Sequence, residues 1–147
     1  NPGWNHLAWA YNLATPVAYL YINGADAEVA GSTETDDTID YTVTNHGIGG
    51  RPDVAGSLLN ADLADVLIAF GEFFDISNSA NLLKLRSAAG KPLNLGANGA
   101  TPSGSQPIMF FRRAPGAAAS TFATNLGGGG DFTITGALTN ATTSPSD

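Results

Sequence analysis

WNHLAWAYNLATPVAYLYING, residues 4–24, is the stretch of this chain that decides its fold. Residues 4–11 alternate as a β-strand does. The two faces are Trp4, His6, Ala8 and Ala10 on one side and Asn5, Leu7, Trp9 and Tyr11 on the other. Residues 17–23 are rich in β-branched and aromatic side chains, and Asn12 to Pro16 supplies turn chemistry between the two runs. The stretch therefore predicts a β-hairpin.

Further β-structure is predicted after this hairpin. Asn23 and Gly24 close the second strand, because both residue types tolerate a positive φ angle. Residues 25–38 are acidic and small, and they predict a loop or a short edge strand. Residues 39–44 alternate again and predict another strand, which ends in the turn-rich residues 47–52.

The middle of the chain contains one ambiguous segment and one predicted helix. Residues 61–70 fit a helix or a strand, and the apolar run 66–70 before a glycine favours a buried strand. Residues 78–88 predict a short helix with Ser77 as its N-cap. Gly90 lies where a glycine commonly follows a helix end.

The last third of the chain predicts two more strands, at residues 106–113 and 131–138. The glycine run 127–130 lacks the Lys and the following helix of a phosphate-binding loop. It predicts a sharp bend or a close backbone approach, with Asn125 capping the turn. Short strands separated by Gly, Pro and Asn turns predict an all-β sandwich or barrel, as one domain over residues 1–147.

Composition restricts the classes of function. Charged residues make up 13% of the 147 residues, and the formal net charge is −7. The six basic residues are dispersed, so no nucleic-acid partner is expected. The chain has no Cys, which excludes disulfides and thiolate sites, and no apolar run long enough to predict a membrane span. A surface of small neutral groups favours close packing in an assembly.

No set of residues predicts catalysis, and we expect the protein not to be an enzyme. His6 lies beside Trp4 on one strand face and is expected to pack inside the fold. His46 precedes a glycine turn and has no partner at a recognisable triad spacing. Glu72 and Asp75 are three residues apart, which does not place two carboxylates on one strand face, as a glycoside hydrolase would require.

The acidic loop offers a candidate calcium site. Asp36, Asp37 and Asp40 are the best candidate ligands, and Asp26 is a weaker one, because calcium takes carboxylate oxygens from flexible loops. No D-x-D-x-D-G pattern is present, so a solvated acidic loop is the preferred interpretation. No other cofactor is predicted.

The hairpin resembles a known fold family. Residues 4–8 (WNHLA) followed by 20–24 (LYING) resemble the central hairpin of laminin-G-like, concanavalin A-like jelly rolls. Residues 48–50 (IGG) and 63–66 (LADV) resemble later elements of the same family. The resemblance implies an antiparallel jelly-roll β-sandwich with one short helix near residues 78–88.

The second half resembles a narrower group, the lectin-like domains carried by tailed-bacteriophage virion proteins. The motifs that carry this resemblance are FDIS at 74–77, GKP at 90–92, NLG at 94–96, Gly99, PSG at 102–104, QPI at 106–108, NLGGGGDF at 125–132 and TSPS at 143–146. The resemblance implies a virion structural protein, either a capsid decoration or a tail or fibre component. Its expected partners are other virion proteins or copies of itself, and its expected location is the surface of the extracellular particle.

The position of the hairpin in the chain carries a further expectation. Several strands precede the W-x-H strand in the jelly-roll family, whereas three residues precede Trp4 here. The resemblance therefore implies that the N-terminal strands are missing from this sequence. Upstream residues, another chain or another copy would supply them, because native proteins avoid exposed sheet edges.

A second function stays open. The alternative is a carbohydrate-binding lectin module that attaches a virion or a secreted protein to cell-surface glycan. Its candidate stacking residues are Trp9, Tyr11, Tyr19 and Tyr21. Packing in the core explains most of these aromatic residues more simply.

Overall fold

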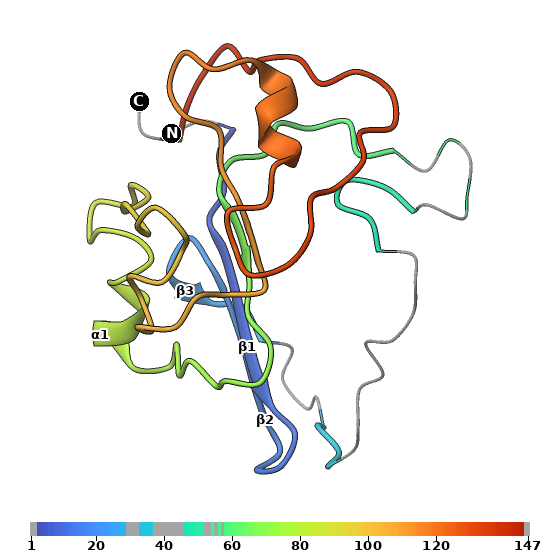
Figure 1. The fold of residues 1–147 in the computed structure, drawn as a ribbon. Helices are drawn as coiled ribbons and strands as arrows, with labels where there is room; N and C mark the ends of the chain where they lie inside the picture. The colour runs from blue at the N-terminus through green and yellow to red at the C-terminus, as the bar shows by residue number, and fades with distance from the viewer. Residues whose placement is uncertain are drawn as a thin grey trace.

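The computed structural model describes residues 3–28, 33–36, 46–51, 54, 56 and 58–145. Two small antiparallel sheets organise this part of the chain, and long irregular segments connect them (Figure 1). The first sheet has the order β1-β2-β3, with strands Leu7–Asn12, Val17–Ile22 and Ala25–Asp26. The second pairs β4 (Val66–Ile68) with β5 (Met109–Phe111). A four-residue helix, α1 (Ser79–Leu82), and a 3-10 helix, η1 (Ala119–Ala123), complete the elements. The predicted β class with one short helix is confirmed at this level.

The predicted hairpin is present, with its turns where the sequence places them. Asn12 pairs with Val17, so four residues form the β1–β2 turn, and the side-chain oxygen of Asn12 accepts from the N–H of Ala14 at 3.1 Å. Asn23 and Gly24 form the two-residue β2–β3 turn with φ angles of 55° and 82°. Two positive φ angles match the twist of the flanking strands. The predicted short edge strand after this turn is β3.

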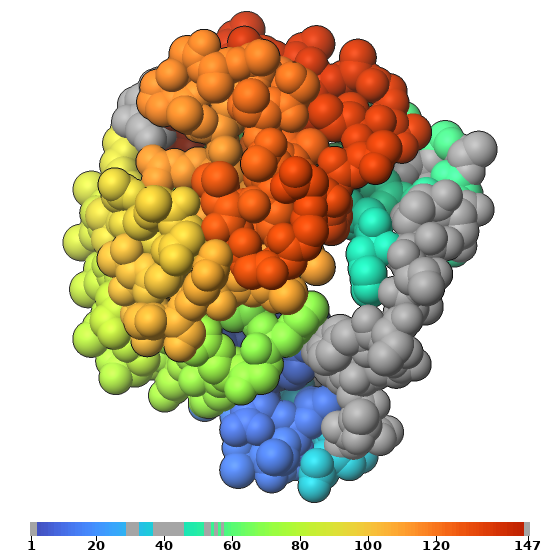
Figure 2. Space-filling model, viewed as in Figure 1, coloured from blue at the N-terminus to red at the C-terminus, as the bar shows by residue number. Residues whose placement is uncertain are grey.

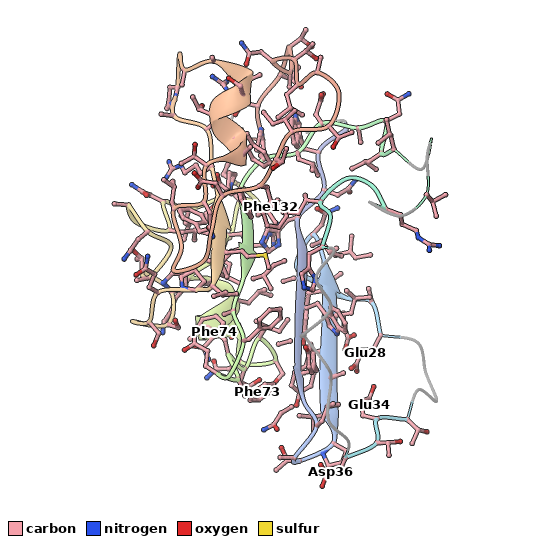
Figure 3. The ribbon with its side chains drawn as sticks, turned by 45° about the vertical axis from the view of Figure 1, so that its right-hand side comes forward. Glu28, Glu34, Asp36, Phe73, Phe74 and Phe132 are labelled. Atoms are coloured by element: carbon pink, nitrogen blue, oxygen red, sulfur yellow. The ribbon has the colours of Figure 1, made fainter. Side chains whose placement is uncertain are left out.

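The inner face of the hairpin packs on the segment around α1. Ala8, Ile76 and Leu82 form its buried core, with exposed fractions of 7%, 2% and 8%. The small side chain of Ala8 leaves room for close approach. Figure 3 shows Phe73 and Phe74 on this same side of the hairpin, between it and the rest of the chain. Among the described residues, this buried cluster joins the inner face of the hairpin to the segment around α1.

A second core lies around β5. Phe110 and Phe111 are 0% and 1% exposed, and each such burial stabilises the fold by about 2–3 kcal/mol. Phe111 packs against Phe132, with ring centroids 4.8 Å apart. A Cβ at Gly99 would lie 2.9 Å from the ring of Phe110, so only glycine fits there without movement. This core depends on the irregular C-terminal third, which covers much of the face seen in Figure 2.

The predicted helix over residues 78–88 is wrong in length and in its cap. Helix α1 ends at Leu82, and Asn78 caps it by accepting from the N–H of Ala80 at 3.0 Å. Ser77 instead donates its hydroxyl to Asp75, at 2.6 Å. The C-terminal half of the expected helix forms a hairpin-like return, in which the N–H of Leu93 donates to the carbonyl of Leu85 at 3.3 Å. Pairing between residues 85–86 and residues 92–93 overrides helix propensity here.

The other predicted strands have mixed outcomes. The strand interpretation of residues 66–70 is confirmed for 66–68, and the strand at 106–113 is confirmed for 109–111. Residues 131–138 form no strand, although residues 131–135 keep the expected alternation of exposure. The strand predicted at residues 39–44 lies outside the described residues.

Candidate binding surface

The outward-facing side chains of the hairpin form the main candidate surface. We call it the outer hairpin face, and it consists of Leu7, Trp9, Tyr11, Leu20 and Ile22. The register places Leu7 opposite Ile22 and Trp9 opposite Leu20, and period-two alternation brings them to one side. Leu7, Trp9 and Ile22 are 66%, 68% and 41% exposed. Such apolar side chains, gathered on one face, are typical of an interaction surface.

The four predicted glycan-stacking residues divide between the two faces. Trp9 and Tyr11 share the outer hairpin face, where their ring centroids lie 5.0 Å apart with a 42° angle between the ring planes. Tyr19 and Tyr21 pair with Ala10 and Ala8 and so point to the inner face. Both tyrosines pack against the buried core. The structure therefore brings together two of the four residues. In the β1–β2 register, Trp9 and Tyr11 of β1 pair with Leu20 and Ala18 of β2, so the tyrosines of β2 lie on the opposite face.

The surroundings of Tyr21 on the inner face raise the pKa of its phenol. Burial is the main reason that its pKa is raised, and the carboxylates of Asp26 and Glu28 add to the effect. A neutral phenol is the form that this environment favours. Tyr19, on the same face, packs against Phe73 with ring centroids 6.2 Å apart. These two tyrosines serve the packing of the hairpin rather than its outer surface.

His6 lies at the start of the hairpin, beside Arg86. Its backbone carbonyl accepts from the N–H of Asn23 at 2.8 Å, and its own N–H donates to the side chain of Asn23 at 2.9 Å. Burial lowers the pKa of His6, and the positive charge of Arg86 lowers it further. A Cβ at Gly24 would collide with the Arg86 guanidinium, so this glycine leaves room for it. A half-buried, neutral imidazole agrees with the packing role expected for His6.

Three acidic side chains of residues 28–36 lie away from the inner core. Figure 3 shows Glu28, Glu34 and Asp36 on the other side of the hairpin from Phe73 and Phe74. Asp36 is exposed. Of the other predicted calcium ligands, Asp37 and Asp40 lie outside the described residues, and Asp26 accepts from the N–H of Glu28 at 3.0 Å. Among the residues that the structure describes, no three His, Asp or Glu side chains converge as a metal site would require.

The two carboxylates weighed for hydrolysis have different partners. Glu72 accepts from the hydroxyl of Ser103 at 3.1 Å. Asp75 accepts from the backbone N–H of Ser77 at 3.0 Å and also from its hydroxyl. Glu72 thus links two segments that are far apart in sequence, whereas Asp75 orders its own loop.

Asn125 organises the C-terminal third to an extent that its sequence context did not predict. Its side-chain oxygen accepts from the N–H groups of Phe110 and Gly127, both at 2.9 Å. Its side-chain nitrogen donates to the carbonyls of Ile108 and Gly130, at 3.0 and 3.2 Å. One amide thereby joins β5 and the residue before it to the glycine run. The position of Asn125 two residues before four glycines was the sequence feature that could have indicated this role.

The glycine run makes the close backbone approach that the sequence predicts. A Cβ at Gly127 would lie 2.6 Å from the carbonyl oxygen of Pro107, and one at Gly129 would lie 2.8 Å from that of Ile108. At Gly130 nothing lies within 4 Å of the added carbon. The backbone of this run therefore lies directly against residues 107–108, which immediately precede β5.

Comparisons with known proteins identify no relative: no protein family, curated protein or solved structure matches this chain. No helix in the described part of the chain has the length and apolarity needed to cross a membrane. The outer hairpin face is therefore the feature on which a function is proposed.

Proposed function

We propose that this protein is a bacteriophage virion structural protein with a jelly-roll fold, serving as a capsid decoration or a tail or fibre component. It acts by binding rather than catalysis, at the surface of the particle. Its partners are other virion proteins or copies of itself. The ordered motifs of the second half and the hairpin motifs support this family, and the antiparallel sheets are consistent with it.

The observation that carries a binding role is the outer hairpin face. Trp9 is 68% exposed and Leu7 is 66% exposed, which is a large apolar exposure for side chains on a regular strand. Removing this apolar surface from water contributes about 25 cal/mol for each Å² that a partner covers. Residues 3–25 contain no Asp, Glu, Lys or Arg, so the hairpin surface relies on shape and apolar contact. Many copies on one particle would strengthen weak contacts by avidity.

The test of this function is the composition of purified particles. Particles from cultures that carry the gene are separated on a density gradient and digested for mass spectrometry. We expect peptides of this chain to co-sediment with the particles at a fixed copy number relative to the main coat protein. Absence from washed particles, with the chain present in the lysate, would contradict the proposal.

The aromatic pair of the outer hairpin face favours one second candidate, a lectin module. Trp9 is exposed and lies beside the half-buried ring of Tyr11, which suits stacking of Trp9 against the apolar face of a sugar. A glycan array probes this function, with Trp9→Ala as the variant and Leu138→Ala as an exposed control elsewhere in the chain. Binding that survives Trp9→Ala unchanged would remove the outer hairpin face as the sugar site.

A further inference from the structure

Along β1, the backbone N–H and C=O groups of successive residues point alternately to the two edges of the strand. The N–H of Asn23 donates to the carbonyl of His6, so His6 and Ala8 direct their backbone groups toward β2. On the other side of β2, the N–H of Ala27 donates to the carbonyl of Leu20, which fits the same phase. The backbone groups of Leu7 and Trp9 must then point to the opposite edge of β1.

Around Leu7 and Trp9, the described edge of β1 has neither the proline nor the charged residues that protect many edge strands. In the part of the chain that the structure describes, β1 is the last strand of its sheet, and no hydrogen bond joins the outward backbone groups of Leu7 or Trp9 to another segment. The strand sequence, LAWAYN, contains no Pro, Lys or other charged residue. Native proteins usually block pairing at an edge with those residues. The β1 edge is therefore competent to pair with another strand.

The two edges of the same sheet differ in charge. The β3 edge has Asp26 within it and Glu28 two residues later. Glu34 and Asp36 also lie on the side of the hairpin away from the inner core (Figure 3). Two copies of a chain with net charge −7 repel each other at an acidic edge and approach most easily at a neutral one. This asymmetry selects the β1 edge, and it suits a second copy as the partner.

We propose that β1 pairs with β1 of a second copy of this chain, in an antiparallel arrangement about a two-fold axis. The N–H and C=O groups of Leu7 and Trp9 bond across the axis, and two three-stranded sheets join into one six-stranded sheet. The Leu7 and Trp9 side chains of the two copies then lie side by side on the joined outer faces. This inference names the partner in the protein–protein binding proposed above, and it rests on that function for its biological setting.

The distances between charges favour this arrangement. Neighbouring strands lie about 4.8 Å apart, so five spacings separate the two β3 strands of the joined sheet, about 24 Å. This exceeds the Debye length, roughly 10 Å at 0.1 M salt. Pairing through β3 would instead place the two Asp26 residues on adjacent strands, about 5 Å apart. Stable interfaces bury about 1,200–2,000 Å² in total, and a contact made by one edge strand of each copy is small, so we expect the dimer to dissociate on dilution.

Sedimentation velocity of the 147-residue chain over a range of concentrations tests the proposal. We expect the unmodified chain to shift from monomer to dimer as its concentration rises. Leu7→Lys introduces a charge at the edge and should raise the dissociation constant at least 10-fold. Leu58→Lys is the matched control, because Leu58 is 67% exposed against 66% for Leu7, and both changes alter the net charge by +1. The control should dimerise as the unmodified chain does.

Amide hydrogen exchange of the unmodified chain provides a second readout that needs no variant. Edge pairing predicts that the amides of Leu7 and Trp9 exchange quickly in dilute solution and become protected at high concentration. The amides of Ala8 and Ala10 should be protected in both conditions, because they already bond to β2. Association without protection of Leu7 and Trp9 would place the interface elsewhere and overturn the inference.

Failure of this inference is distinguishable from failure of the proposed function. A chain that stays monomeric at every concentration, or a Leu7→Lys variant that dimerises normally, overturns β1 pairing. The same chain can still be present in purified particles, which is the separate test of the function. Capture of the β1 edge by a different protein would appear as protection of Leu7 and Trp9 in particles but not in the isolated chain, and would also overturn it.

Discussion

The indole N–H of Trp4 donates a hydrogen bond to the hydroxyl of Thr143 at 3.0 Å, across 139 positions of sequence. Trp4 immediately precedes the hairpin, and Thr143 lies near the end of the described chain. This bond links the hairpin to the C-terminal third, which has little regular structure of its own.

Thr143→Val should lower the free energy of unfolding by about 0.5–1 kcal/mol, the usual net value of one exposed hydrogen bond. Valine keeps the shape of threonine and removes the acceptor. Thr142→Val is the control, since Thr142 is the neighbouring exposed threonine. Urea unfolding measures both variants. Equal losses in the two would show that the bond to Trp4 contributes nothing specific.

The glycine run should respond to alanine position by position. Gly127→Ala and Gly129→Ala should each cost about 1–3 kcal/mol, because the added carbon meets the backbone carbonyls of Pro107 and Ile108. Gly130→Ala should be neutral or slightly stabilising, because its Cβ meets nothing and the unfolded chain loses freedom. Thermal unfolding of the three variants is the measurement, and a uniform effect would contradict the close approach.

Asn125→Ala should be among the most damaging polar substitutions in the chain. It removes four side-chain hydrogen bonds, which together contribute about 2–4 kcal/mol. Asn98→Ala removes a single bond to the N–H of Ala100, at 3.3 Å, and should cost less than about 1 kcal/mol. Denaturant unfolding of the pair gives the comparison. A small loss in Asn125→Ala would mean that the glycine run holds its place without this amide.

His6 should make the protein less stable in mild acid. Burial, helped by Arg86, lowers its pKa in the folded state from 6.5, the value in the unfolded chain. The unfolded state therefore binds more protons between the two pKa values, so stability is complete above pH 6.5 and is lost as pH falls below it. Unfolding at pH 7.5 and 5.5 measures the change.

The variant that tests this pH dependence is His6→Gln, which should flatten the acid slope because glutamine does not titrate. A histidine NMR titration provides a direct check, because the His6 resonance should titrate below pH 6.5. A His6 resonance that titrates at or above this value would contradict the burial argument.

Local chemistry explains which parts of the fold the sequence predicts well. The hairpin and its Asn23–Gly24 turn depend on residues close together in sequence, and the structure has both. The helix ends earlier than expected, because the carbonyl of Leu85 accepts from the N–H of Leu93. Helix propensity describes single residues and cannot predict such a contact. Residues 131–135 alternate in exposure but form no strand. The carbonyls of Phe110 and Ile108 already accept from the N–H groups of Leu126 and Gly129, so residues 126–129 take that side of β5.

The candidate surface was predictable in part. Alternation alone places Leu7, Trp9 and Tyr11 on one face of the first strand. It does not relate this face to the aromatic residues of the next strand, because the register depends on the number of residues in the turn. The four-residue turn between Asn12 and Val17 directs Tyr19 and Tyr21 inward.

The difference in charge between the two edges of the first sheet limits how many copies can join it. Once the β1 edges of two copies have paired, neither is available to a third copy. The two edges that remain are the β3 strands, and both have Asp26. A two-fold contact of this kind is closed, unlike a head-to-tail contact, which repeats into fibres. Two short acidic strands at the ends of the joined sheet would therefore stop strand addition at two copies, and keep a chain rich in exposed apolar residues from polymerising.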